Sequence, residues 1–168
     1  MKGNRQLDLT RVLFAVYLLI LVWILLFKMS FSIDELYKPR SVNLIPFMGS
    51  VIVNGRIDIS EIINNILVFI PVGIYICMLK KDWSILKKLS VGFFISLGIE
   101  VLQFVLALGA TDITDLIGNT FGGIIGIGVF YLFSKVFKNK TNAIINILAL
   151  IATILLLVFI SILLFANF

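Results

Sequence analysis

The chain has 168 residues, of which 61% are hydrophobic and only 14% are charged, and its mean hydropathy is +1.15. Soluble domains carry about 25% charged residues, so this composition excludes an ordinary soluble protein and predicts an integral membrane protein. The sequence has no histidine, which excludes the commonest general base and zinc ligand, and one cysteine, which excludes a disulfide framework. The net charge of +5 comes from lysines and arginines scattered between apolar runs, a distribution typical of membrane orientation and not of nucleic-acid binding.

Five apolar runs are long enough to cross a bilayer, which takes about 20 residues. In chain order they cover residues 11–28, 61–79, 89–108, 115–134 and 144–166. No small-residue cleavage site follows the first run, so we expect it to stay as an uncleaved span. The sequence therefore predicts an all-α, polytopic membrane bundle of about five transmembrane helices.

Two spans contain residues that indicate how they pack. Pro71 and Gly73 predict a kink in the second span. Gly118, Gly122 and Gly126 recur every four residues in the fourth, and such a stripe of small residues lets another helix approach closely. The fifth span has no ionisable residue, so we expect it to face lipid.

The basic residues predict the orientation. Ten of the fourteen lie before or at the start of the first span, between the second and third, or between the fourth and fifth: Lys2, Arg5, Arg11, Lys80, Lys81, Lys87, Lys88, Lys135, Lys138 and Lys140. Because such residues favour the cytoplasmic side, we expect the N-terminus inside and the C-terminus outside. The predicted organisation is a four-span membrane domain over residues 1–134, with an outer loop at 29–60, followed by a cytoplasmic loop and the fifth helix at 135–168.

The outer loop is too apolar for an ordinary solvated connection. It contains the stretch "SVNLIPFMGSVIVNGRIDIS", in which Pro46 restricts the backbone of "NLIPF". We expect this segment to lie on the outer membrane surface or to dip into it.

Polar side chains gather where three spans reach the outer surface in this topology. Within each span they recur at helical spacing: Glu61, Asn64 and Asn65; Glu100 and Gln103; Asp112, Asp115 and Asn119. Because the second and fourth spans begin outside and the third ends outside, the three polar faces lie at one depth. The sequence therefore predicts a polar pocket shared by three helices.

Most of these residues also have a purely structural explanation. Glu61 and Asp115 lie in first turns, where a carboxylate complements the helix dipole. Asn64, Asn65 and Gln103 can join helices through hydrogen bonds, an explanation that we favour for Asn64. Glu100 differs, because it lies among apolar residues away from a helix end, where a charge costs about 2.5–3.5 kcal/mol. Such a carboxylate indicates a function or a specific partner.

The four carboxylates Glu61, Glu100, Asp112 and Asp115 would repel one another strongly if all were ionised in a low dielectric. Three arrangements relieve this repulsion. Some carboxylic acids stay protonated, an arginine such as Arg56 folds over the cluster, or all four bind a divalent cation such as Mg²⁺, Mn²⁺ or Ca²⁺. The sequence leaves the three open.

The candidate roles follow from the residue types. Glu100 is the acid–base candidate, and Asp112 and Asp115 are further catalytic candidates or ligands of a cation or headgroup. No nucleophile stands out, since Ser96 lies one turn before Glu100 without a base that would activate it. The expected substrate-binding residues are Asn43, Arg56, Glu61, Asn65, Gln103 and Asn119.

Four motifs, "NLIPF", "EIINNILVFIPVG", "IEVLQF" and "DITDLIGNTFGGIIG", occur in an order and spacing that resemble the VanZ-like family of bacterial membrane proteins, over about residues 10–134. The resemblance implies a place in the bacterial cytoplasmic membrane, and through the family's named member it implies a link to low-level teicoplanin resistance. Many members carry an aspartate where Thr114 stands and an arginine just before the last motif, where residues 109–111 have none. An anion site would therefore need Arg40 or Arg56. By this likeness the matching positions are Asn43, Pro46, Phe47, Glu61, Asn65, Pro71, Gly73, Glu100, Gln103, Asp112, Asp115, Asn119 and Gly123.

Three functions fit these observations. The first is an enzyme or handling protein for an envelope lipid or lipid-tailed molecule, acting at the outer leaflet. The second is a non-enzymatic module that binds a lipid-tailed antibiotic or cell-wall precursor and alters its access. The third, a proton- or cation-coupled carrier, is disfavoured because the inner halves of these spans lack ionisable groups. The sequence leaves open whether the protein is an enzyme, and a purely structural role for all the polar residues is the remaining alternative.

Overall fold

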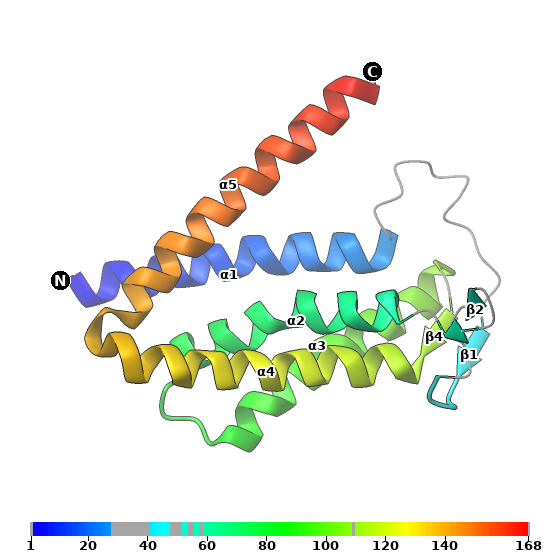
Figure 1. Cartoon of the computed structure of the whole chain (residues 1–168), viewed down its shortest axis with the longest axis horizontal. Coiled ribbons are helices and arrows are strands. Elements are labelled where there is room, and N and C mark those ends of the chain that lie inside the picture. The colour runs from blue at the N-terminus through cyan, green and yellow to red at the C-terminus, as the bar shows by residue number, and fades with distance from the viewer. Residues whose placement is uncertain are drawn as a thin grey trace.

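The structure, a computed structural model, describes residues 2–27, 41–47, 52–53, 56–57, 59–108 and 110–167. It is a bundle of long apolar helices with short strands at one end (Figure 1). The helices are α1 (Lys2–Phe27), α2 (Ser60–Leu79), α3 (Ile85–Leu106), α4 (Ile113–Phe137) and α5 (Thr141–Asn167), with a 3-10 turn, η1 (Lys138–Lys140), before α5. The strands are β1 (Ser41–Asn43), β2 (Ile52–Val53), β3 (Arg56–Ile57) and β4 (Ala110–Asp112).

The structure confirms the predicted all-α bundle of helices with the length and composition of membrane spans. Four helical stretches of the described chain are long and apolar enough to cross a membrane: Arg5–Leu26, Ser60–Leu79, Ile85–Leu106 and Ile113–Leu163. The last has 51 residues, and as a straight helix it would span about 77 Å, more than twice the hydrocarbon thickness. Figure 1 shows that it folds back at η1 into two arms, α4 and α5. Five separate crossings and the orientation of the chain stay predictions.

The glycine stripe of α4 packs against α2, as the sequence predicts. The backbone of Gly122 lies against the carbonyl group of Ile66, and that of Gly126 lies against the carbonyl group of Ile70, one turn further along both helices. In return, Gly73 of α2 contacts the α4 backbone. This close approach aligns the polar residues at the starts of α2 and α4.

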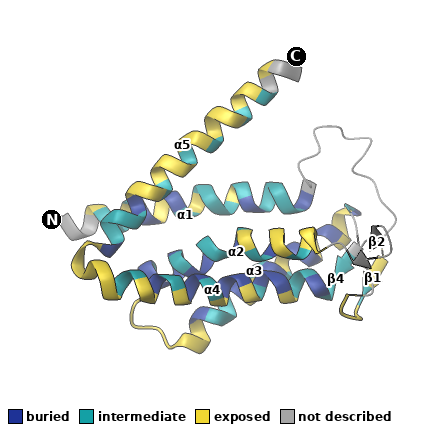
Figure 2. Cartoon of the chain, in the orientation of Figure 1, coloured by how far each residue is buried: buried dark blue, intermediate teal, exposed yellow. Residues whose placement is uncertain are grey.

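Helix α1 covers α2 and α3, with Leu21, Phe69 and Ile99 among the buried side chains between them. Its N-terminal end is joined to α5 by buried polar groups. The Thr10 hydroxyl donates to Asn146 Oδ1 at 3.1 Å, and Asn146 Nδ2 donates to Gln6 Oε1 at 2.9 Å. Beyond this contact α5 diverges from the bundle, and most of its side chains are exposed (Figure 2).

The strands lie at the end of the bundle opposite the N-terminus and the η1 turn (Figure 1). Strand β1 pairs in parallel with β4, with Asn43 opposite Asp112, and β2 pairs antiparallel with β3. The predicted outer loop therefore contains strand structure that the sequence analysis did not anticipate. The connections rich in lysine and arginine lie at the other end, which agrees with the predicted separation of charge.

Candidate functional site

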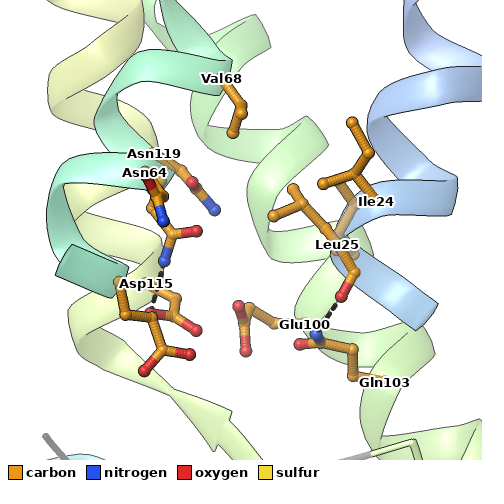
Figure 3. Close-up of a pocket in the computed structure, with 11 residues that line it drawn as sticks. Ile24, Leu25, Asn64, Val68, Glu100, Gln103, Asp115 and Asn119 are labelled. Atoms are coloured by element: carbon orange, nitrogen blue, oxygen red, sulfur yellow. Dashed lines mark hydrogen bonds between the residues drawn. The ribbon is translucent and has the colours of Figure 1, made fainter. Parts of the chain in front are cut away.

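A pocket of about 300 Å³ opens near the strand end of the bundle, and four helices contribute to it (Figure 3). The structure brings together most of the polar residues that the sequence placed at one depth. The lining residues are Ile24 and Leu25 from α1; Glu61, Asn64, Asn65 and Val68 from α2; Ile99, Glu100 and Gln103 from α3; and Asp115 and Asn119 from α4.

The contribution of α1 is a feature that sequence reasoning missed. Ile24 and Leu25 close one side of the pocket, and the backbone carbonyl of Leu25 accepts a hydrogen bond of 2.9 Å from Gln103 Nε2. Helix α1 is apolar along this stretch, so its sequence carries no signal that would have assigned it to a polar site.

Glu100 is buried, with 3% of its surface exposed, and it lies on α3 less than two turns before that helix ends. Its Oε2 accepts a hydrogen bond of 3.1 Å from the backbone N–H of Asp112, and its backbone carbonyl accepts one from the Thr111 hydroxyl. The buried carboxylate thus supports the strand β4 that leads into α4, while it also lines the pocket.

Asp112 differs from its predicted place. The sequence suggested a helical stripe of Asp112, Asp115 and Asn119, but Asp112 is the N-cap of α4, with an extended backbone. Its carboxylate accepts from Thr114 N–H at 2.7 Å and from Asn43 Nδ2 at 3.0 Å, and it is not among the residues that line the pocket. The physical reason is that a residue before the first helical turn bonds the unpaired N–H groups there and does not follow the helical repeat.

Asn43 likewise holds the segment 41–47 instead of lining the pocket. Its Oδ1 accepts from Ile45 N–H at 3.2 Å, and Phe47 N–H donates to the Thr114 hydroxyl at 3.0 Å. The large apolar side chains of the segment are exposed: Val42, Leu44, Ile45 and Phe47. Its expected position at the outer membrane surface stays a prediction.

The two arginines proposed near the site are not placed. The backbone of Arg56 belongs to β3, while its side chain and all of Arg40 lie outside the described residues. Within the described ranges, no group of three or more Asp, Glu or Cys side chains is arranged to hold a metal ion. The described residues therefore give no support to the cation proposed for Glu61, Glu100, Asp112 and Asp115.

The contact between α2 and α4 inside the pocket is a hydrogen bond from Asn65 Nδ2 to Asp115 Oδ1 at 2.6 Å. Asn65 is 6% exposed, whereas the adjacent Asn64 is exposed at the rim. The sequence favoured Asn64 as the residue that joins helices; the structure gives this role to Asn65.

Replacing Asn65 and Asn64 in turn tests this assignment through the stability of the protein. We expect Asn65→Leu to lower the free energy of unfolding by about 2 kcal/mol, because the Asp115 carboxylate loses a charge-assisted hydrogen bond. The matched change Asn64→Leu is expected to alter it by less than about 0.5 kcal/mol. Reversible unfolding in mixed micelles measures both, and equal losses would contradict the assignment.

Two amide oxygens in the pocket are buried without a hydrogen-bond partner among the described residues: Gln103 Oε1 and Asn119 Oδ1. Gln103 is 4% exposed and Asn119 is 1% exposed. The amide nitrogens of both are used, since Gln103 donates to Leu25 and Asn119 Nδ2 donates to the Ser96 hydroxyl oxygen at 2.9 Å. Ser96 is fully buried and is a hydrogen-bond acceptor for Asn119 rather than a residue of the pocket wall.

The chain is similar to known proteins. The family model described as VanZ/LLP1 matches residues 14–134. The chain is also 36% identical over 154 residues to "Protein VanZ" from Enterococcus faecium, an alignment that covers 90% of this chain and 92% of that protein. No solved structure matches the chain significantly.

Proposed function

The chain belongs to the VanZ/LLP1 family, and we propose that it binds a lipid or lipid-tailed molecule of the bacterial envelope, with the polar head of that molecule in the pocket. The observation that carries the proposal is a polar cavity near one end of an otherwise apolar membrane bundle. A soluble ligand would need no apolar surroundings, whereas a lipid needs a polar cavity beside an apolar surface.

The rim of the pocket supports this proposal. On α2, Asn64 lines the pocket, and the neighbouring Ile63 and Leu67 are 45% and 55% exposed. Apolar side chains exposed on a membrane helix face hydrocarbon, so a tail leaving the pocket would remain in an apolar medium. The polar lining and the apolar rim together match an amphipathic molecule.

We further propose that the pocket faces the outer leaflet. The support is the gathering of basic connections at the opposite end of the bundle, which the positive-inside rule assigns to the cytoplasm.

Orientation can be measured with single cysteines in a Cys77→Ser background. Ser41 and Asp82 are both exposed. Ser41 begins β1 and Asp82 belongs to the connection between α2 and α3, and these two segments lie at opposite ends of the bundle (Figure 1). An impermeant thiol reagent added to intact cells is expected to label Ser41→Cys and not Asp82→Cys, and permeabilised cells provide the control in which both react. Labelling of Asp82→Cys alone in intact cells would reverse the orientation.

Lipid mass spectrometry tests the binding function. Protein purified in mild detergent is expected to carry one lipid-tailed species enriched at least tenfold over the bulk membrane. The variant Asn64→Trp, which narrows the pocket at its rim, should lose the enrichment, while Ile63→Trp on the neighbouring position outside the lining should keep it. A lipid whose mass changes in cells that contain the protein would establish chemistry in addition to binding. Equal lipid content in all three proteins would refute the proposal.

Because the family is linked to teicoplanin resistance, the sensitivity of cells to teicoplanin provides a further test. If the bound molecule governs access of a glycopeptide to the cell surface, expression of the protein should raise the inhibitory concentration of teicoplanin, and Asn64→Trp should remove this protection.

A further inference from the structure

We infer that the headgroup bound in this pocket presents hydrogen-bond donors, hydroxyl or primary amine groups, to Gln103 and Asn119, and that it is not recognised through a phosphate. The inference rests on the proposed function and specifies the ligand class. It follows from two buried amide oxygens that no donor of the described chain reaches.

The orientation of Gln103 is set by its partner. The backbone carbonyl of Leu25 can only accept a hydrogen bond, so the side-chain nitrogen must face it, and the oxygen is left toward the pocket (Figure 3). This oxygen has no partner among the described residues. Leaving a buried carbonyl oxygen without a donor costs about 1–3 kcal/mol of free energy, which a ligand that supplies the donor would recover.

Asn119, on the facing helix, has the second unpartnered amide oxygen of the described chain. Its nitrogen donates to Ser96, and its oxygen is buried and unpartnered within the described chain. Two acceptors on α3 and α4 therefore line one cavity, and both need donors from the molecule that fills it. A headgroup with several donors, such as a sugar, can satisfy the two oxygens at once.

The remaining polar lining also consists mainly of acceptors. Glu61, Glu100 and Asp115 contribute carboxylates, and no lysine or arginine lines the pocket among the residues that the structure describes. A phosphate without a bound proton offers only acceptors, so it would meet the amide oxygens without forming hydrogen bonds. The two unpartnered amide oxygens thus favour a headgroup that has hydrogen-bond donors.

The experiment uses the full chain in nanodiscs of phosphatidylcholine, whose headgroup has no hydrogen-bond donor. Each preparation contains a small fraction of one diacyl lipid, which has a glucosyl head, a primary-amine head or, in phosphatidic acid, a phosphate head. Binding is measured above the second pKa of the phosphate, so that phosphatidic acid has no P–OH donor. Native mass spectrometry measures the bound lipid. We expect the glucosyl or the amine lipid to bind at least tenfold better than phosphatidic acid, and the better of the two identifies the donor.

The variants connect this preference to the two oxygens. Asn119→Leu and Gln103→Met, on different helices, should each reduce donor-lipid binding about fivefold to tenfold, so the test survives if one of them fails to fold. Asn119→Asp keeps an acceptor and allows the Ser96 hydroxyl to donate to it, so binding should be largely retained. The control Asn146→Leu removes a fully buried asparagine from the α1–α5 contact, and it should leave the preference unchanged.

The outcomes separate the two levels of the proposal. Binding of phosphatidic acid equal to or better than that of both donor lipids would overturn the inference and leave lipid binding intact. The inference would also fail if the donor-lipid preference persisted in both Asn119→Leu and Gln103→Met. Failure of every added lipid to bind would overturn the proposed function itself.

Discussion

Replacing Gly122 with alanine is expected to lower the free energy of unfolding by about 3 kcal/mol, at the upper end of the usual cost of overpacking. An added Cβ would stand 2.9 Å from both the Ile66 carbonyl carbon and Phe69 Cβ, and closer still to the Ile66 carbonyl oxygen. Because the obstacle includes backbone of α2, no side-chain rotation relieves it. Helices α2 and α4 must therefore move apart, which would also lengthen the hydrogen bond between Asn65 and Asp115.

The next residue along α4 provides the control. An added Cβ at Gly123 meets nothing within 4 Å, so Gly123→Ala should be neutral or should stabilise the protein by up to about 1 kcal/mol through helix propensity. Denaturation of both variants in mixed micelles, followed by circular dichroism, measures the difference. Similar stabilities for the two proteins would show that α2 and α4 do not pack through this stripe.

Glu100 is expected to give the largest functional effect, and two substitutions separate its structural contribution from its charge. Glu100→Leu removes the acceptor of the Asp112 N–H and leaves that buried donor unsatisfied. We expect it to cost about 2 kcal/mol of stability and to increase hydrogen exchange in the segments 41–47 and 110–112. Glu100→Gln keeps an acceptor oxygen in place, so the fold should be preserved within about 1 kcal/mol.

The same glutamine variant tests whether the charge at Glu100 serves the pocket. We expect Glu100→Gln to reduce lipid binding, or protection against teicoplanin in cells, at least tenfold despite an intact fold. The matched variant Gln6→Glu, at the other end of the bundle, controls for a general effect of changing charge. A fully active Glu100→Gln protein would assign this residue to structure alone.

Much of the architecture could be predicted from the sequence because hydropathy and residue spacing report on local structure. The apolar runs located the helices to within a few residues at most ends; α1 was the exception and begins nine residues before its predicted span. The spacing of Gly118, Gly122 and Gly126 predicted the close packing of α2 and α4, since only small residues allow such an approach. The convergence of polar faces in one pocket followed from up-and-down connectivity.

Other features depended on contacts between distant segments, which spacing does not report. The pairing of β1 with β4 involves three residues on each side, too few for a recognisable alternation. Asp112 was assigned to the helical stripe because its sequence position continues the repeat, although its backbone is extended. The place of Leu25 in the pocket depends on its backbone carbonyl, which is common to all residues and invisible in a sequence.

The parallel pairing of β1 with β4 has a consequence for biosynthesis. Asn43 and Asp112 are 69 residues apart, so at 5–20 residues per second the ribosome needs roughly 3–14 s to supply the second strand after the first. The Thr114 hydroxyl that anchors Phe47 arrives with the start of α4. A nascent chain that has completed only α3 therefore lacks both anchors of the segment 41–47, and this segment can reach its final position only after the start of α4 has been synthesised.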